Sequence, residues 1–409
     1  MSDYISVDDA LQSILPQIPE AASQRTQLGN CRARHLARPV NAPWSSPRFD
    51  NSAMDGYALR YADVEDVPAT LEIAGEASAG NPADEVLSEG QAIRISTGAA
   101  LPSGADTVIR QERCRTGDDG TVTVEKLPSS GRGANIRRAG VYLDADQPAL
   151  EVGTRLGGAE IGLLASFGQS VVTTFAPPRV AIISTGDELV ELDDDPGPGQ
   201  IVNSNSYMLE ALSEEFGATP RVYPTAPDDR RAIEETYRRA IAECDMVLSS
   251  GGVSVGDHDH VGAVLDELSD GMSFWKVRMK PGKPLAFGVA HADEKPVPLI
   301  GLPGNPASSF VGFHLFVRPA LAVAQGVDAA DAPLARIDAT LRGTARGSSG
   351  RRAFLAGSAR PTGDGLLFEP RAHQSSGNPA LFAAANALGI VDRGIDALDD
   401  GATIPVHVL

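Results

Sequence analysis

The sequence predicts a multidomain α/β protein, and three observations support this fold class. Its 409 residues exceed what a single hydrophobic core usually supports. Between residues 179 and 268, strand-like and helix-like segments alternate, which favours a parallel sheet covered by helices on both faces. Short runs rich in β-branched residues lie at about 45–140 and beyond about 330, and they predict smaller β domains.

The first part of the chain is expected to begin with a helix. Ser6 and Asp9 have the spacing of a capping box, and apolar residues follow at helical spacing up to Leu15. The β-rich region at about 45–140 comes next, and apolar helical spacing returns within 151–175. The β module is therefore expected to be inserted into a helical element.

The central region is expected to alternate in a regular order. Its predicted strands are 179–183, 221–225 and 246–250, and its predicted helices are 206–217, 228–244 and 260–268. A strand is then expected over 274–280, another ends in the loop 301–306, and a helix follows over 307–322. This pattern predicts a parallel sheet as the core of the region.

Composition narrows the possible functions. Asp and Glu number 54 against 35 Lys and Arg, for a formal net charge of −19, which argues against a nucleic-acid partner or an anionic membrane surface. The N-terminus has no signal-peptide pattern, and we expect no segment long enough to cross a bilayer, so a cytoplasmic location is expected. Three cysteines without a CxxC pair indicate neither a disulfide framework nor a thiolate zinc site. The acidic balance with few lysines is compatible with adaptation to high salt.

A glycine-containing loop follows the predicted strand 179–183, at the sheet edge where ligands of such sheets bind. The hydroxyl and backbone N–H groups of 184–186 (Ser184, Thr185, Gly186) can hold phosphate oxygens, and Asp187 and Glu188 come next. Carboxylates beside a phosphate site are what Mg²⁺ binding requires. Taken alone, such a loop is equally well explained as a strand-to-helix turn.

A second glycine-rich stretch, 249–260, follows the predicted strand 246–250. Gly251 and Gly252 lack a Cβ, so a ligand can approach their backbone, and Ser250 and Ser254 flank them. The run 257–260 contains His and Asp, but no HExxH motif or cysteine pair supports a transition-metal site there. Two such loops at equivalent places in one sheet favour anion binding over a pair of structural turns.

Three of the five lysines lie within residues 276–283. If 274–280 is a strand, Lys276, Arg278 and Lys280 point to one face, and Lys283 follows after a Pro-Gly turn. On an acidic protein, such a cationic row would attract a polyanionic small ligand.

Two further regions offer candidate binding loops. The loop 301–309, which contains Pro303, Gly304 and Asn305, opens a helix whose N-terminus is an anion site. In the β module, Asp55 and Thr97 lie in turn-rich loops that, taken alone, are ordinary turns. Walker A and GxGxxG motifs are both absent, so ATPase and dinucleotide functions lack their characteristic signals.

Nine motifs resemble, in order, those of the MoeA family, the molybdopterin molybdenumtransferases, which includes the E domain of gephyrin. They are DNSAMDGYA, ISTGAALPSGADTVI, NIRRAG, STGDELV, GQIVNSNS, GGVSVGDHD, KPGKP, GLPGNPASS and QSSGNPALFAAANAL. The resemblance covers nearly the whole chain and implies four domains. These are a split helical and dimerisation domain (1–46 and 138–176), an inserted β domain (47–137), a central α/β parallel-sheet domain like that of the molybdopterin adenylyltransferases (177–327) and a C-terminal β-barrel (328–409).

The resemblance also implies an activity. Family members are homodimers whose site lies between the central domain of one subunit and the inserted β domain of the other. They insert molybdate into adenylylated molybdopterin and release AMP in a Mg²⁺-dependent step. Candidate protein partners are a molybdopterin adenylyltransferase and the enzymes that receive the cofactor.

Positions that match the family's motifs give the candidate site residues. The resemblance implies Asp259 and Glu188 as Mg²⁺ ligands, and Lys276 and Lys280 as partners of pyrophosphate or molybdate oxygens. Ser204 lies where the family contacts molybdate. The candidate catalytic residues are Asp55, Glu188, Asp228, Asp259, Lys276 and Lys280, and the candidate substrate-binding residues are Thr97, Ser184, Thr185, Gly186, Asp187, Ser204, Ser250, Gly251, Gly252, Ser254, Lys283, Pro303, Gly304 and Asn305.

Two positions depart from the family pattern. After NIRRAG the family has Glu-Asp, and this chain has Val141 and Tyr142; the family's Asp before Ser/Thr-Asn is Asn203 here. A tyrosine does not carry a carboxylate's charge at neutral pH. Two alternatives to an active transferase therefore stay open: a catalytically weak paralogue that binds molybdopterin or acts as a scaffold, and a molybdopterin adenylyltransferase.

Overall fold

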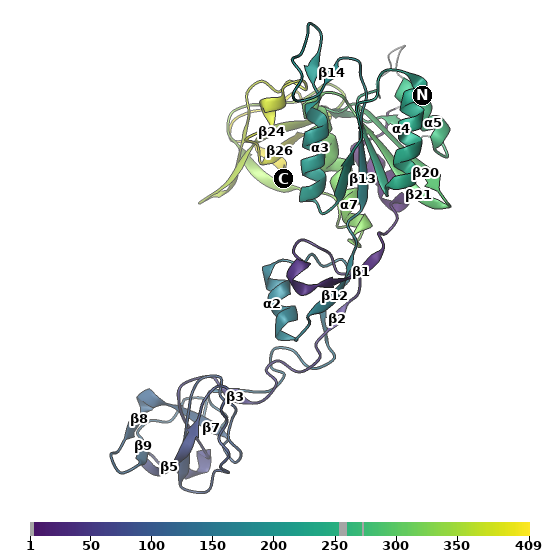
Figure 1. The fold of residues 1–409 in the computed structure, drawn as a ribbon. Helices are drawn as coiled ribbons and strands as arrows, with labels where there is room; N and C mark the ends of the chain where they lie inside the picture. Colours follow the sequence, from purple (N-terminus) through teal and green to yellow (C-terminus); the bar gives the residue numbers. More distant parts are fainter. Residues whose placement is uncertain (1–3, 253–259, 272–273) are drawn as a thin grey trace. The chain divides into compact units, whose positions relative to one another are not determined.

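The computed structural model describes residues 4–252, 260–271 and 274–409 and divides into two compact units (Figure 1). The large unit comprises Met1–Arg38, Val152–Gly162 and Ser170–Leu409, and the small unit comprises Pro39–Glu151 and Leu163–Gln169. Helix α2 (Gly158–Ser166) contributes residues to both units. The four domain boundaries implied by the family resemblance are finer than this division and stay a prediction.

The small unit is built on a six-stranded sheet in the order β7-β4-β6-β5-β9-β8, as its β-rich runs predicted. Successive residues of β4 face opposite sides of the sheet, so Tyr57 and Leu59 pack into one hydrophobic cluster and Ala58 into another. Two short ladders, β2–β11 and β3–β10, complete the unit. The strands are β2 (Val40–Asn41), β3 (Asn51–Ser52), β4 (Gly56–Leu59), β5 (Ala69–Ala77), β6 (Gln91–Ile95), β7 (Thr107–Arg110), β8 (Cys114–Thr116), β9 (Thr121–Val124), β10 (Ile136–Arg137) and β11 (Pro148–Leu150).

The large unit contains a six-stranded sheet in the order β16-β13-β17-β21-β20-β18. Strands β16, β13, β17 and β21 are parallel, as the alternating pattern predicted, whereas β20, which lies outside that pattern, is antiparallel to both of its neighbours. The sequence did not separate β20 from its surroundings because this strand is almost continuously apolar and buried. The strands are β13 (Arg179–Ser184), β16 (Thr219–Val222), β17 (Met246–Ser250), β18 (Phe274–Lys276), β20 (Pro284–Ala292) and β21 (Lys295–Leu302).

Helices cover both faces of this sheet, as the alternating pattern predicted (Figure 1). On β13, Val180 and Ile182 pack with one hydrophobic cluster, whereas Ala181 and Ile183 pack with the other. The first cluster includes residues of α1 (Val7–Ile14) and α3 (Ser204–Glu215), and the second includes residues of α4 (Arg230–Glu243) and α5 (His260–Leu268). The predicted capping box of α1 is confirmed, because Ser6 and Asp9 exchange hydrogen bonds of 3.0 and 3.3 Å.

The helical run that follows β21 has three parts: α6 (Pro306–Gly312), a π-helical turn (Phe313–Val317) and α7 (Arg318–Ala324). The run has 19 residues, and an 18-residue window of it has a mean hydropathy of 1.4, so by length and composition it could cross a bilayer, and the expectation that no such segment exists is wrong. Of that window, 78% is buried inside the structure, as in a core helix.

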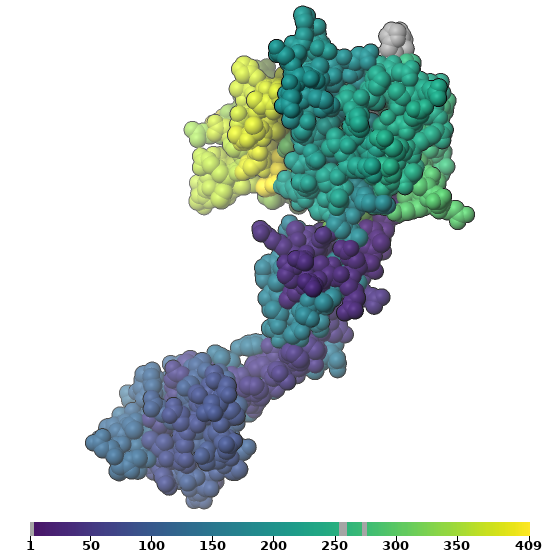
Figure 2. All heavy atoms as spheres, viewed as in Figure 1, coloured from purple at the N-terminus to yellow at the C-terminus, as the bar shows by residue number. Residues whose placement is uncertain are grey.

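Beyond residue 330, five strands form a closed barrel in which β24, β25, β22, β28 and β26 pair in turn and β26 pairs back with β24. This confirms the predicted C-terminal barrel. Its Phe354, Leu388 and Ile390 share a hydrophobic cluster with the central helices, and the yellow C-terminal residues lie against the central region in Figure 2. The barrel strands are β22 (Ile337–Leu341), β24 (Arg352–Thr362), β25 (Gly365–Pro370), β26 (Ala387–Val391) and β28 (Thr403–Val408).

The segment 274–280 is not one strand. β18 belongs to the central sheet, whereas β19 (Met279–Lys280) pairs with Arg352 and Ala353 of β24 in the barrel. The expected row of Lys276, Arg278 and Lys280 on one strand face is therefore wrong. The pairing partner changes in the middle of the segment, which local alternation does not reveal.

The other strands of the large unit form short ladders: β1–β12, β14–β15 and β23–β27. Their bounds are β1 (Ser23–Gln27), β12 (Val171–Phe175), β14 (Leu189–Val190), β15 (Ile201–Val202), β23 (Ala345–Arg346) and β27 (Ala397–Leu398).

Candidate functional site

A pocket of about 550 Å³, here called the loop pocket, lies where β13, β17 and β21 end. Parallel strands bring the loops after them to one edge of the sheet, which is why residues far apart in sequence meet there. The candidate residues that line it are Ser184, Thr185, Gly186, Glu188, Ser204, Asp228, Ser250, Gly251, Gly252, Pro303, Gly304 and Asn305.

The glycine-rich loops pack tightly against one another. Thr185 N–H donates to the carbonyl of Ser250 at 3.4 Å, and Gly251 N–H donates to the carbonyl of Leu302 at 3.2 Å. Gly252 has a φ of +64°, and a Cβ there would lie 2.2 Å from Cγ2 of Val261. Position 252 therefore requires glycine for the packing of α5 as well as for its backbone conformation.

Two buried oxygens of the loop pocket have no hydrogen-bond partner within the described part of the chain: Thr185 Oγ1 and Asn205 Oδ1. The Asn205 amide is held in place because its Nδ2 donates to Ser250 Oγ and to the Gly304 carbonyl, each at 2.7 Å. A buried polar atom left without a partner costs about 1–3 kcal/mol, so such atoms are normally satisfied by a ligand or an ordered water. These two oxygens are therefore candidate acceptors for ligand N–H or O–H groups.

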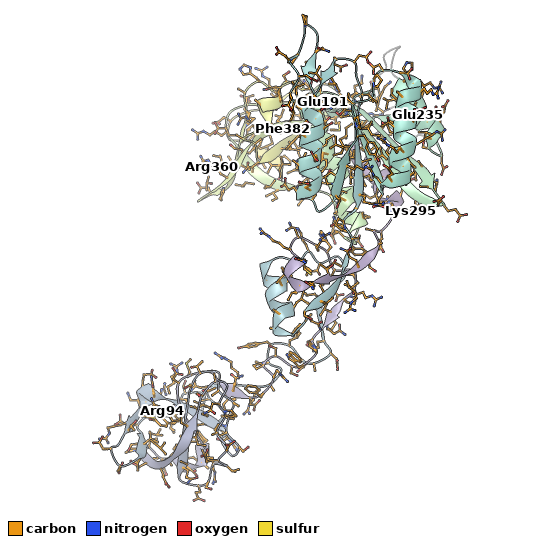
Figure 3. The ribbon with its side chains drawn as sticks, in the orientation of Figure 1. Arg94, Glu191, Glu235, Lys295, Arg360 and Phe382 are labelled. Carbon is orange, nitrogen blue, oxygen red and sulfur yellow. The ribbon has the colours of Figure 1, made fainter. Side chains whose placement is uncertain are left out.

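The N-terminus of α3, which carries Ser204 and Asn205, is fixed by Asn203. The Asn203 side chain accepts from Ser206 N–H at 3.3 Å and donates to Thr225 Oγ1 at 3.1 Å. Thr225 donates in turn to Glu191, which lies between β14 and β15 (Figure 3). Asn203 is 4% exposed, so this departure from the family pattern acts as a helix cap that orients the pocket wall.

Carboxylates line one side of the loop pocket. Glu188 and Asp228 are lining residues, whereas Asp187 instead accepts the N–H of Asp228 at 3.1 Å and supports that loop. The predicted Asp259 and Ser254, like the run 257–259, lie outside the described residues. Among the residues that are described, no group of three or more His, Cys, Asp or Glu side chains could hold a metal ion.

A second pocket, about 540 Å³ and here called the cationic pocket, lies between β19, the loop after it and the barrel. It is lined by Lys280 and Lys283 and by barrel arginines Arg346, Arg351 and Arg371. It shares Pro284 and Asn305 with the loop pocket, so the two pockets adjoin. Such a concentration of positive charge on a protein of net charge −19 attracts small anions.

Sequence reasoning missed two sets of site residues. Asn205 directly follows Ser204 in the NSNS stretch, so its polarity at the start of a helix was the available signal. The barrel arginines had no local signal, because they reach the lysines only through the pairing of β19 with β24. The predicted Lys276 lines neither pocket; its Nζ instead lies 5.8 Å from the centre of the Tyr4 ring.

The small unit carries the other candidate residues. Asp55 Oδ1 accepts both the N–H of Thr97 at 2.7 Å and its hydroxyl at 2.9 Å. These two hydrogen bonds, with the backbone bond the stronger influence, hold the pKa of Asp55 below its usual value. Tyr142 is 67% exposed and Val141 is 58% exposed. The structure thus brings Asp55 and Thr97 together, as two predicted site residues on one surface.

Family models match most of the chain. The MoeA N-terminal region (domain I and II) matches residues 5–168, and a probable molybdopterin binding domain matches residues 181–323.

Known proteins resemble the chain over nearly its whole length. It is 39% identical to a molybdopterin molybdenumtransferase of Nostoc sp. over 98% of this chain and 93% of the relative. It is 32% identical to a Staphylococcus epidermidis protein of the same name over 98% and 95%. A crystal structure of the molybdopterin biosynthesis moeA protein of Pyrococcus horikoshii superposes with a TM-score of 0.86 at 28% identity, covering 99% of this chain and all of that one (100%).

Proposed function

Since the chain belongs to the MoeA family of molybdopterin molybdenumtransferases, enzymes of molybdenum cofactor biosynthesis, we propose that it inserts molybdate into adenylylated molybdopterin with release of AMP. The observation that carries the proposal is the pair of adjoining pockets, one lined by glycine-rich loops and the other by cations. The lining of the first pocket suits a phosphate-containing organic substrate, and the lining of the second suits a small oxyanion.

In this proposal the adenylylated pterin occupies the loop pocket. The N-terminus of α3, at Ser204 and Asn205, binds its phosphate oxygens, because the N–H groups of Thr185, Gly186 and Gly251 already donate to backbone carbonyls. Thr185 Oγ1 and Asn205 Oδ1, which lack partners among the described residues, accept hydrogen bonds from its N–H or O–H groups. Ser204, at the first turn of α3, faces the same space and is the proposed contact for molybdate on this side.

Molybdate is proposed to arrive through the cationic pocket, where Lys280 and Lys283 bind its oxygens. Because the two pockets share Pro284 and Asn305, the incoming oxyanion and the pterin would bind next to each other. Glu188 and Asp228 also line the loop pocket, and their negative charge would repel the anionic groups of the substrate unless a cation lies between them.

Mg²⁺ fits this arrangement as a substrate-associated ion. Mg²⁺ commonly binds through one or two carboxylates together with substrate phosphates, so a dedicated group of three protein ligands is not required. We propose Glu188, together with Asp259, as its protein ligands, and the ion would neutralise charge on the pyrophosphate link. Chelation with EDTA should therefore stop AMP release, and added Mg²⁺ should restore it.

We further propose that the enzyme is a homodimer whose site combines the large unit of one subunit with Asp55 and Thr97 of the other. An Asp55→Asn variant and a Lys280→Ala variant should each be nearly inactive. After unfolding and refolding together in equal amounts, a site shared between subunits should restore about a quarter of the activity, since half of the dimers are mixed and each has one intact site. No recovery would show that the residues act within one subunit.

The direct test supplies the purified full-length chain with adenylylated molybdopterin, Mg²⁺ and molybdate and measures AMP by chromatography. AMP release that depends on molybdate supports the transferase. If AMP is not released, or is released equally without molybdate, the proposed function is wrong. Incubation with ATP and molybdopterin distinguishes an adenylyltransferase, which alone would release pyrophosphate.

Tyr142, which stands where the family has a carboxylate, is expected to lower the rate of AMP release. We expect Tyr142→Asp to raise molybdate-dependent AMP release, because it places a carboxylate at the exposed position where the family has one. Tyr142→Asn is the matched neutral control and should not raise it. Equal rates for the wild type and both variants would show that the tyrosine is tolerated.

A further inference from the structure

The N-terminal segment is fixed beside the lysines. Ile5 forms a parallel bridge with Val277: its N–H donates to the Lys276 carbonyl at 3.2 Å, and its own carbonyl accepts the N–H of Arg278 at 2.8 Å. The capping box of α1 begins at the next residue, Ser6. The backbone that carries Tyr4 is therefore attached on one side to the lysine-bearing segment and on the other to a capped helix.

The side chain of Tyr4 lies among cations. Its ring centre is 5.8 Å from Lys276 Nζ and 5.3 Å from Lys283 Nζ, both within the range of a cation–π interaction. A hydrogen bond with Lys283 and the charges of Lys283, Lys276 and Arg351 hold the pKa of Tyr4 below its usual value. One aromatic side chain thus contacts two of the three lysines that follow one another in 276–283.

Tyr4 also connects to the cationic pocket. Together with Lys283, Arg351 and Arg278 it lines a smaller pocket of about 320 Å³. Lys283 and Arg351 line the cationic pocket as well, so the two spaces meet at these side chains. Tyr4 therefore lines a space that adjoins the pocket where molybdate is proposed to bind.

We propose that Tyr4 is a positioning residue for molybdate uptake, which holds the ammonium group of Lys283, a lining residue of the cationic pocket, and that of the neighbouring Lys276 against one aromatic ring. This inference rests on the proposed function. Two lysines side by side repel each other and have flexible stems, and an aromatic face offsets both effects by binding the ammonium groups in one arrangement. An arriving oxyanion then replaces the tyrosine hydroxyl at Lys283, because an acceptor that carries a full negative charge binds an ammonium group more strongly than a hydroxyl does.

The test compares full-length Tyr4→Phe and Tyr4→Leu with the wild type. AMP release is measured against molybdate at saturating adenylylated molybdopterin, and then against adenylylated molybdopterin at saturating molybdate. Tyr4→Leu should raise the KM for molybdate about five- to tenfold, as expected from the loss of two exposed cation–π contacts, while kcat and the other KM change less than about twofold. Tyr4→Phe keeps the ring and should recover most of the difference.

Two further readouts separate positioning from folding and from the proposed function. The thermal unfolding midpoint of Tyr4→Leu should match that of Tyr4→Phe, and calorimetric titration with molybdate alone should show weaker binding only for Tyr4→Leu. An unchanged KM for molybdate, or a parallel loss in both KM values and kcat, overturns the inference. If the wild type releases no AMP, the proposed function fails, whereas the titration still decides whether Tyr4 supports oxyanion binding.

Discussion

His314 is a buried histidine whose two ring nitrogens have no hydrogen-bond partner in the described part of the chain. It is 3% exposed and lies in the π-helical turn. Its ring centre is 4.5 Å from that of Phe310, and Phe216 and Phe313 pack at 5.8 and 5.9 Å. Burial in this apolar site, assisted by the charge of Arg318, lowers the pKa of His314 to about 3.

The lowered pKa of His314 predicts that the free energy of unfolding decreases in acid. In the unfolded chain His314 is protonated near pH 6.5, whereas in the folded chain its pKa is about 3. The contribution of His314 to the free energy of unfolding is therefore fully present above about pH 6.5 and is lost as the pH falls from 6.5 towards 3. The contribution of one such group is about 1.4 kcal/mol per pH unit. The free energy of unfolding, measured with urea at pH 7.5, 6 and 5, should fall more steeply with decreasing pH for the wild type than for His314→Leu.

At the scale of single elements, α3 shows how a loop of the site depends on a helix cap. Asn203 accepts the N–H of Ser206 and also lies 3.3 Å from Ser184 Oγ, and the Ser184 and Ser206 hydroxyls are 2.8 Å apart. The cap therefore ties the start of α3 to the glycine-rich loop after β13. A change at Asn203 affects helix stability and pocket geometry together.

Asn203→Ala should lower the free energy of unfolding by about 1–2 kcal/mol, because it removes the cap acceptor and leaves buried hydroxyls with one partner fewer. Asn203→Asp keeps the cap acceptor and restores the family's residue but loses the Nδ2 donor to Thr225, so its destabilisation should be smaller than that of Asn203→Ala. Urea unfolding followed by circular dichroism measures both. Equal losses in the two variants would contradict the role of the side chain as a cap.

At the scale of the whole large unit, hydrogen bonds and ion pairs connect α1 to the C-terminal barrel. The guanidinium of Arg352 donates to both oxygens of Asp8 at 3.0 and 3.2 Å, and its Nε donates to Asp392 at 2.8 Å. The Arg352 side chain is 18% exposed, so these contacts are less screened than ordinary surface pairs. Asp8, near the start of the sequence, and Arg352, in the C-terminal barrel, thus stabilise the large unit together.

Arg352→Met should destabilise the large unit by about 1–3 kcal/mol, because it removes charge-assisted hydrogen bonds to two carboxylates. Arg231→Met is the matched control: it pairs with Glu235 within α4, and both side chains are largely exposed (86% and 66%). That control should change the free energy of unfolding by less than about 0.5 kcal/mol. Urea unfolding of both variants decides, and a loss for Arg352→Met no larger than for the control would contradict the role of the contact.

Much of the architecture could be predicted from local patterns. The strand predicted at 246–250 is observed as Met246–Ser250, and the helix predicted at 228–244 is observed as Arg230–Glu243. These elements are bounded by caps and glycines, which act over a few residues. The division of 274–280 between two sheets and the antiparallel β20 were not predictable in this way, because strand pairing is a property of distant partners.

The same distinction applies to the site. The sequence by itself determined the loop pocket, since the conformations of Gly251 and Gly252 and the hydroxyls after β13 are local requirements that appear directly as residue types. Only the tertiary structure decided which cations act together. Because β19 pairs with β24 of the barrel and not with the central sheet, Lys280 and Lys283 line one pocket together with three barrel arginines. Lys276 lies outside this pocket, beside the ring of Tyr4. Charges attract an anion only when the fold brings them within a few ångströms of one point, and the sequence does not encode that distance locally.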